Sequence, residues 1–296
     1  MIVHHAGKNG DLVYALPVVK ALARQHGKIT LVTSALCYQL VPLLWEQPYI
    51  ADVEMDYSRS YRIDEHGSLD PWSVLSPEEG INLSPQPAMY RPHAPVQWTH
   101  AYAEIAGIDK LEPRDKIALP TLWNHRQWYW EHTVKTEGKD GGETLWSPPK
   151  TAVLAPESET LKTIPLQYWR RLAEWIAPHF DAVLVIGTKP DKEFSRVAKV
   201  RDLRGLTTVA SVARLCSEAH IVIAANSLPW HIARHSGTPT FCWQDQYLER
   251  CVPVDTPYAF YTVDQLERMS EDVIGFAEHP VTTLWNNKAL EELEAA

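Results

Sequence analysis

The residues best suited to bind a charged ligand lie between two apolar runs in the last third of the chain. The first run, Ile221–Ala225, ends at Asn226 and Ser227, and a short helix led by Pro229 is expected to follow. This order places a turn between the carboxyl end of a strand and the amino end of a helix. Backbone N–H groups and the helix dipole point at an anion in such a turn. The segment therefore predicts a phosphate-binding site.

A second candidate is the first loop, Ala6–Leu12, which reads AGKNGDL. It lacks the G-x-G-x-x-G pattern of dinucleotide sites and the G-K-[ST] ending of a P-loop. On spacing alone, Asp11 is either a helix cap beside a glycine turn or a residue with a functional role.

Periodic apolar residues predict alternating strands and helices in both halves of the chain. In the amino half the expected strands are 2–5, 29–33 and 53–55, and the expected helices are 11–25, 36–45 and 96–106. In the carboxyl half the expected strands are 152–155, 182–186 and 221–224, and the expected helices are 165–179, 191–200, 208–218, 263–278 and 282–294. This order is typical of Rossmann-like parallel sheets. We expect one α/β domain over residues 1–147 and another over residues 148–296.

Residues 57–95 lose this periodicity and are rich in proline, serine and aromatic residues, and residues 57–146 match no motif that we can name. Long irregular stretches with many aromatic side chains usually serve a binding role, and these side chains could stack on bases or on sugars. No metal site is expected. His231 and His235 are spaced to share a helix face, but no third ligand has a suitable spacing.

The bulk properties indicate a cytoplasmic protein without a membrane-spanning segment. The 296 residues are 45% hydrophobic, no stretch approaches the roughly 20 apolar residues of a membrane helix, and the amino terminus lacks a signal-peptide layout. The four cysteines have no C-x-x-C spacing and are expected to be reduced. The net charge of −9 is divided between both halves, so the basic excess of a duplex-binding protein is absent and nucleic acid is disfavoured as a partner.

Both candidate loops resemble motifs of the lipopolysaccharide heptosyltransferase family, glycosyltransferase family nine. The carboxyl-terminal signature of that family usually reads D-[ST]-G-P-x-H-x-A, and Ser227, Pro229, His231 and Ala233 match it, whereas Asn226 replaces Asp and Leu228 replaces Gly. The first loop resembles the family motif G-D-[hydrophobic]-x-x-[ATL]-x-P from Gly10 to Pro17. The resemblance covers roughly residues 2–32 and 151–244.

The resemblance implies a GT-B architecture, in which two Rossmann-like domains face a cleft. It further implies an inverting, metal-independent glycosyltransferase with Asp11 as the general base and no cofactor. The amino domain would bind a glycan or another hydroxyl acceptor, and the carboxyl domain would bind a nucleotide-diphosphate sugar. Lys162 would contact the donor diphosphate, and Glu193 could reach the ribose. The implied donor-site residues are Ser158, Thr160, Lys162, Gly187, Thr188, Asn226, Ser227, Leu228, Pro229 and His231.

Two alternatives stay open at this point. The same fold could glycosylate a modified phage DNA base or a protein side chain. Alternatively, Asn226 and Leu228 could mark a catalytically degenerate protein that binds a nucleotide or glycan without turnover. A sugar-nucleotide epimerase shares the architecture but fits the loop of Gly10 and Asp11 less well.

Overall fold

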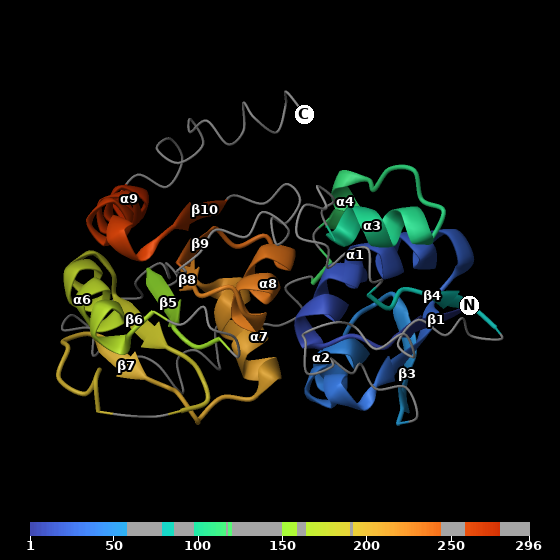
Figure 1. Ribbon diagram of the computed structural model, residues 1–296, viewed down its shortest axis with the longest axis horizontal. Helices are drawn as coiled ribbons and strands as arrows, with labels where there is room; N and C mark the ends of the chain where they lie inside the picture. The colour runs from blue at the N-terminus through green and yellow to red at the C-terminus, as the bar shows by residue number, and fades with distance from the viewer. Residues whose placement is uncertain are drawn as a thin grey trace, which may run out of the picture.

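The computed structural model describes residues 1–57, 79–85, 98–116, 118–119, 150–158, 164–189, 192–243 and 258–278. Within these residues the strands form two parallel sheets, one in each half of the chain (Figure 1). The first sheet has the order β3-β2-β1-β4, with β1 (Ile2–His5), β2 (Ile29–Ser34), β3 (Ile50–Asp56) and β4 (Ile81–Asn82). The second has the order β10-β9-β8-β5-β6-β7, with β5 (Thr151–Ala155), β6 (Ala182–Val185), β7 (Val200–Asp202), β8 (Ile221–Ala224), β9 (Thr240–Trp243) and β10 (Tyr258–Tyr261).

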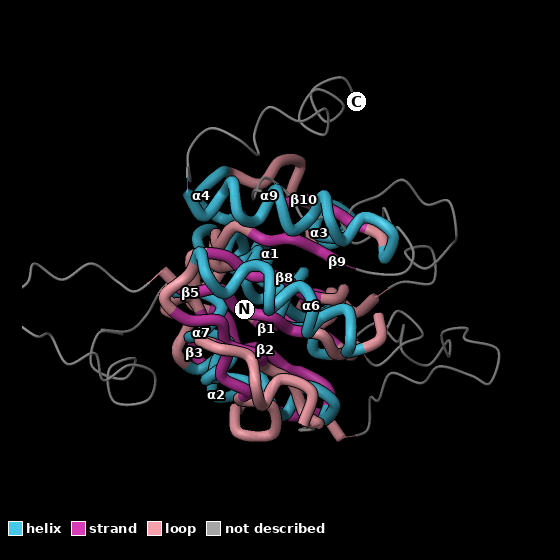
Figure 2. Tube along the Cα trace, turned by 90° about the vertical axis from the view of Figure 1, so that its left-hand side faces the viewer, coloured by secondary structure: helices cyan, strands magenta, loops and turns pink. Residues whose placement is uncertain are grey.

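The second sheet is covered by helices on both faces. Strands β5, β6, β8 and β9 are buried along their whole length, as expected for parallel strands between helical layers. One face packs against α6 (Leu166–Ile176) and α9 (Leu266–Glu278), where the Trp169 and Trp243 rings meet at 4.7 Å. In Figure 2, which views the molecule from the side of this half, α6 lies in front of the strands. The other face packs against α7 (Val209–Glu218) and α8 (Leu228–His235). Short 3-10 helices, η4 (Ala177–His179) and η6 (Val263–Gln265), adjoin α6 and α9.

One long helix and several short ones pack around the first sheet. The helices are α1 (Asn9–His26), η1 (Ala35–Leu40), α2 (Val41–Trp45), α3 (Trp98–Ile105) and α4 (Pro113–Lys116). Arg24 on α1 pairs with the buried Asp115 on α4 and lies 2.9 Å from Glu112. These ion pairs fix the segment of α4 against the end of α1.

The two halves meet through α1 and α8, which face each other in Figure 1. Tyr14 on α1 is buried against the rings of His231 and His235 on α8, with centroids 4.7 and 5.5 Å away. The Leu119 N–H donates to the His235 carbonyl at 2.9 Å, which adds a backbone link across the junction. The apolar core under the first sheet is therefore continuous with the α7–α8 layer of the second.

The structure confirms most of the expected elements and corrects two. The helix expected over residues 191–200 is wrong, because the described residues 192–199 form turns and β7 follows. Lys199 has φ 61° and donates through Nζ to the Phe180 carbonyl, so the chain turns back to pair Val200 with Val183. The short strand β4 lies in a region expected to lack regular structure.

Other expectations fall outside the described residues, including the helix over residues 282–294 and the domain boundary at residues 147–148. Among the described helices, none is long and apolar enough to cross a membrane.

The junction makes stability depend on pH. Burial lowers the pKa of His235 from 6.5 to about 3, and Arg234 adds to the effect. Because the folded pKa lies below the unfolded one, the unfolded chain binds more protons between those values, and the free energy of unfolding falls as the pH is lowered from 6.5. A His235→Gln substitution removes this group. We expect it to reduce the slope of unfolding free energy against pH by about 1.4 kcal/mol per pH unit below pH 6.5. Urea unfolding of both proteins across this range measures the slopes, and equal slopes would contradict the assignment.

Candidate functional site

The loop of Asp11 lies at the point where the strand order of the first sheet reverses. The chain runs from β1 outward through β2 to β3, and β4 then pairs on the other side of β1. Ligands of parallel α/β sheets bind outside the carboxyl ends of the strands at such a switch point. The loop of residues 6–8 follows β1, and Ser84 and Pro85 follow β4, so both segments lie at this edge.

Hydrogen bonds from both neighbouring strands hold this loop. The Ala6 N–H donates to Ser84 Oγ at 2.9 Å. The Gly7 carbonyl accepts from the Cys37 thiol at 3.2 Å and from the Ser34 hydroxyl at 3.4 Å. Burial raises the pKa of Cys37 to about 12, so the thiol keeps its proton and remains a donor. The loop therefore has a fixed backbone path.

Gly7 occupies a space that no side chain can enter. An added Cβ would lie 2.8 Å from His5 Nε2, 2.8 Å from Pro85 Cγ and 2.9 Å from Asp11 Cβ. Asp11 is in the first turn of α1, where its Oδ2 accepts the Lys8 N–H at 2.9 Å. This bond makes Asp11 a cap of α1, which is the first of the two sequence interpretations, and it fixes the carboxylate at the amino end of the helix.

His5 is the neighbour of this carboxylate that sequence reasoning did not select. Of the two adjacent histidines, His4 bonds the Glu79 carbonyl at the surface, whereas His5 is buried and bonds the Leu83 carbonyl at 2.8 Å through Nδ1. Because a carbonyl only accepts, Nδ1 carries the proton. Burial also lowers the pKa of His5 to about 4, so the imidazole is neutral at neutral pH. The sequence feature that could have identified His5 is the alternation of side chains along a strand, which sends one of the two adjacent histidines inward.

The predicted phosphate turn lies at the switch point of the second sheet. The chain runs from β5 through β6 to β7, and β8 then pairs on the other side of β5. The Ser158 hydroxyl after β5 reaches the Asn226 carbonyl after β8 at 3.5 Å. Ser227 precedes the first turn of α8, and Leu228 and Pro229 begin it. Asn226 is buried, and within the described residues no group bonds its Nδ2.

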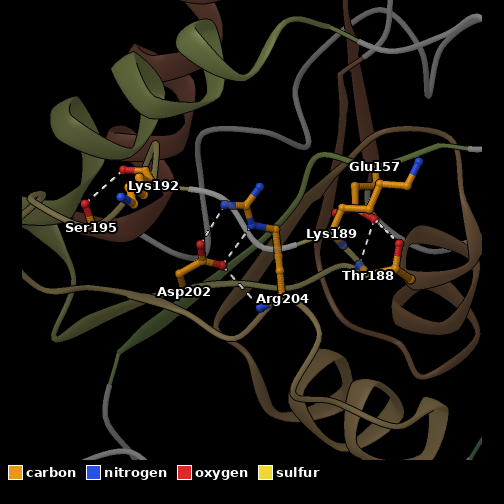
Figure 3. A network of polar contacts seen from close by, with 7 residues as sticks. All are labelled: Glu157, Thr188, Lys189, Lys192, Ser195, Asp202 and Arg204. Atoms are coloured by element: carbon orange, nitrogen blue, oxygen red, sulfur yellow. Dashed lines mark hydrogen bonds and ion pairs between the residues drawn. The ribbon is translucent and has the colours of Figure 1, made fainter.

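The carboxylate of Glu157 binds the loop of Gly187 and Thr188. Glu157 accepts the Thr188 N–H at 2.7 Å, the Thr188 hydroxyl at 2.6 Å and the Lys189 N–H at 2.9 Å (Figure 3). Figure 3 also shows the neighbouring pair of Asp202 and Arg204, whose guanidinium donates to both carboxylate oxygens. The contact of Glu157 with this loop was not predicted from the sequence.

The junction brings the two switch points together. His231 on α8 packs against the first turn of α1, where a Cβ on Gly10 would lie 3.0 Å from its Cδ2. Asp11 is the next residue, so the candidate base lies one residue from the contact between α1 and α8. Two predicted donor-site residues, Thr160 and Lys162, lie outside the described residues. The described residues contain no group of three or more His, Cys, Asp or Glu side chains that could hold a metal ion.

Several solved structures share this arrangement. Comparisons with protein-family models and with curated sequences find no match. A glycosyl transferase family 9 protein from Veillonella parvula matches at a TM-score of 0.64 and 13% identity, over 92% of this chain and 96% of that one. The ADP-heptose lipopolysaccharide heptosyltransferase II of E. coli matches at 0.60 and 14% identity, over 94% and 99%. An E. coli heptosyltransferase with ADP-2-deoxy-2-fluoro heptose matches at 0.58 and 13% identity, over 92% and 99%. The chain therefore has the GT-B fold with two Rossmann-like halves, as its motifs predicted.

The packing around Gly7 yields a stability test. We expect Gly7→Ala to lower the free energy of unfolding by about 1–3 kcal/mol, because the methyl group forces His5, Pro85 or Asp11 to move. Gly275→Ala is the matched control. It lies inside α9 with no atom within 4 Å of an added Cβ, so it should be neutral or stabilising by up to about 1 kcal/mol. Urea unfolding measures the free energy of unfolding of both variants. An unchanged value for Gly7→Ala would contradict the prediction that its added methyl group is crowded.

Proposed function

We propose that this protein is an inverting glycosyltransferase that moves a sugar from a nucleotide-diphosphate donor to an acceptor hydroxyl. The observation that carries the proposal is the contact of Gly10 with His231 on α8, because it places Asp11, the next residue at one switch point, close to the helix that begins at the other. A base from one sheet and an anion-binding turn from the other suit a transfer between two bound substrates. The GT-B fold that the chain shares with heptosyltransferases supports the same function.

In this proposal the acceptor binds in the amino half with its hydroxyl beside Asp11. The hydroxyl oxygen attacks the sugar C1 from the face opposite the diphosphate, and the bond from C1 to the phosphate oxygen breaks. Asp11 takes the hydroxyl proton as the new bond forms, and the configuration at C1 is inverted. The leaving diphosphate carries the negative charge. It would be stabilised by the amino end of α8, by the Ser158 hydroxyl and by Lys162, without a metal ion.

The acceptor is a glycan or another uncharged hydroxyl compound in this proposal. A modified DNA base is disfavoured because the amino half has no basic excess. Asn226 and Leu228 motivate one competing function, a degenerate protein that binds a nucleotide but does not transfer a sugar. The two experiments below separate these functions.

The first experiment tests the base. Asp11→Asn keeps an oxygen that can accept the Lys8 N–H but cannot take a proton, so the loop should remain in place. We expect nucleotide binding to be unchanged and the rate of sugar transfer to fall by about 10²–10⁴. Transfer is followed by release of the nucleoside diphosphate. A near-normal rate in the variant would remove Asp11 from the mechanism.

The second experiment tests the donor site. Thermal unfolding is followed with ADP, GDP, UDP, CDP and dTDP, because a ligand at about 100 times its Kd adds about 2.7 kcal/mol of stability. We expect the protein to prefer the nucleotide of one nucleobase. The stabilisation by that nucleotide should be lost in Lys162→Ala, which removes a positive charge. If no nucleotide stabilises the protein, the donor site is absent. Binding without transfer to any glycan, protein or DNA acceptor would favour the degenerate alternative.

A further inference from the structure

Glu157 fills a set of donors that would otherwise suit an anion. Two successive backbone N–H groups and one hydroxyl of the loop after β6 converge on its carboxylate, at 2.6–2.9 Å. Such groups of main-chain donors commonly bind phosphate or carboxylate ligands. Here a residue of the loop after β5 occupies them. The loop cannot bind a phosphate in the same way while Glu157 remains there.

The approach of the carboxylate depends on the neighbouring glycine. Gly187 has φ 156°, and an added Cβ would lie 2.6 Å from Glu157 Oε1. The Gly187 carbonyl is held from the other side by the Gly205 N–H at 2.8 Å. The loop is therefore shaped to receive this side chain.

Donors of the described residues use three acceptor positions of this carboxylate. A carboxylate offers about four lone-pair positions. Oε2 uses two for Thr188, and Oε1 uses one for the Lys189 N–H. Glu157 is only partly buried, so a ligand can reach it. The remaining position on Oε1 can accept a hydrogen bond from a hydroxyl, and its negative charge repels a phosphate.

We propose that Glu157 is a specificity-determining residue of the donor site, which accepts a hydrogen bond from a ribose hydroxyl of the nucleotide. This inference rests on the proposed function. In the proposed arrangement the diphosphate lies on the β8 side of β5, at Ser158 and α8, and the ribose on the β6 side. Glu193, the acid that the sequence suggested for the ribose, lies 3.6 Å from Arg170 in an ion pair on the α6 side.

The test compares a nucleotide with its deoxy analogues. The probes are ADP, 2′-deoxy-ADP and 3′-deoxy-ADP, or the same set for the base preferred in the panel above, and Kd is measured by calorimetry. We expect the wild type to bind the full ribonucleotide about tenfold more tightly than one of the deoxy analogues. Glu157→Gln should weaken the ribonucleotide about tenfold and leave that deoxy analogue unchanged, so the preference disappears.

A control variant separates the role of Glu157 from a general effect of negative charge. Glu193→Gln removes an equal charge from the competing acid and should keep the preference. Thermal unfolding checks that each variant is folded.

Three results would overturn the inference. The first is equal affinity of the wild type for the ribonucleotide and both deoxy analogues. Glu157 would then only link two loops, and this result can be obtained without any variant. Loss of the preference in Glu193→Gln but not in Glu157→Gln would transfer the role to Glu193. If no nucleotide binds the wild type, the proposed function itself fails and this inference fails with it.

Discussion

The contact between the first turns of α1 and α8 is the constraint on which both candidate sites depend. Each half of the chain has its own sheet and its own switch point, so neither sheet alone sets the distance between them. Gly10 has no side chain, which lets the His231 ring lie against α1, and Tyr14 supplies the next surface one turn further on. Burial of these rings in a continuous apolar core fixes the amino end of α1, which carries Asp11, against the first turn of α8.

The fold and part of the site could be predicted from the sequence because their signals are local. The buried strands are continuous apolar runs, and Pro229 and Thr208 mark helix starts as expected. Asp11 and Ser227 were identifiable because each follows a strand and begins a helix. In parallel sheets that position alone brings residues to the ligand-binding edge.

The remaining features depend on contacts between segments far apart in the sequence. The Glu157 contact requires that β5 and β6 be neighbours and that Gly187 admit a carboxylate, and neither fact is visible in the loop of Glu157 itself. The turns over residues 192–199 replaced an expected helix because Lys199 bonds carbonyls at the end of η4. The two-residue strand β4 carries no periodicity of its own and is recognisable only by its pairing with β1.

Two acidic or amide residues determine where negative charge lies in the proposed donor site. Where the family pattern has Asp after β8, this chain has Asn226, and its loop after β5 carries Glu157. A negative charge is thereby absent from the turn beside α8 and present beside the loop after β6. Removal of a carboxylate from the amino end of a helix favours a bound diphosphate there, because like charges no longer compete for the same N–H groups. The Glu157 carboxylate favours an uncharged, hydroxyl-bearing group on the other side of β5. In the proposed donor site both features would therefore favour one orientation of the nucleotide, with the diphosphate over β8 and the ribose over β6.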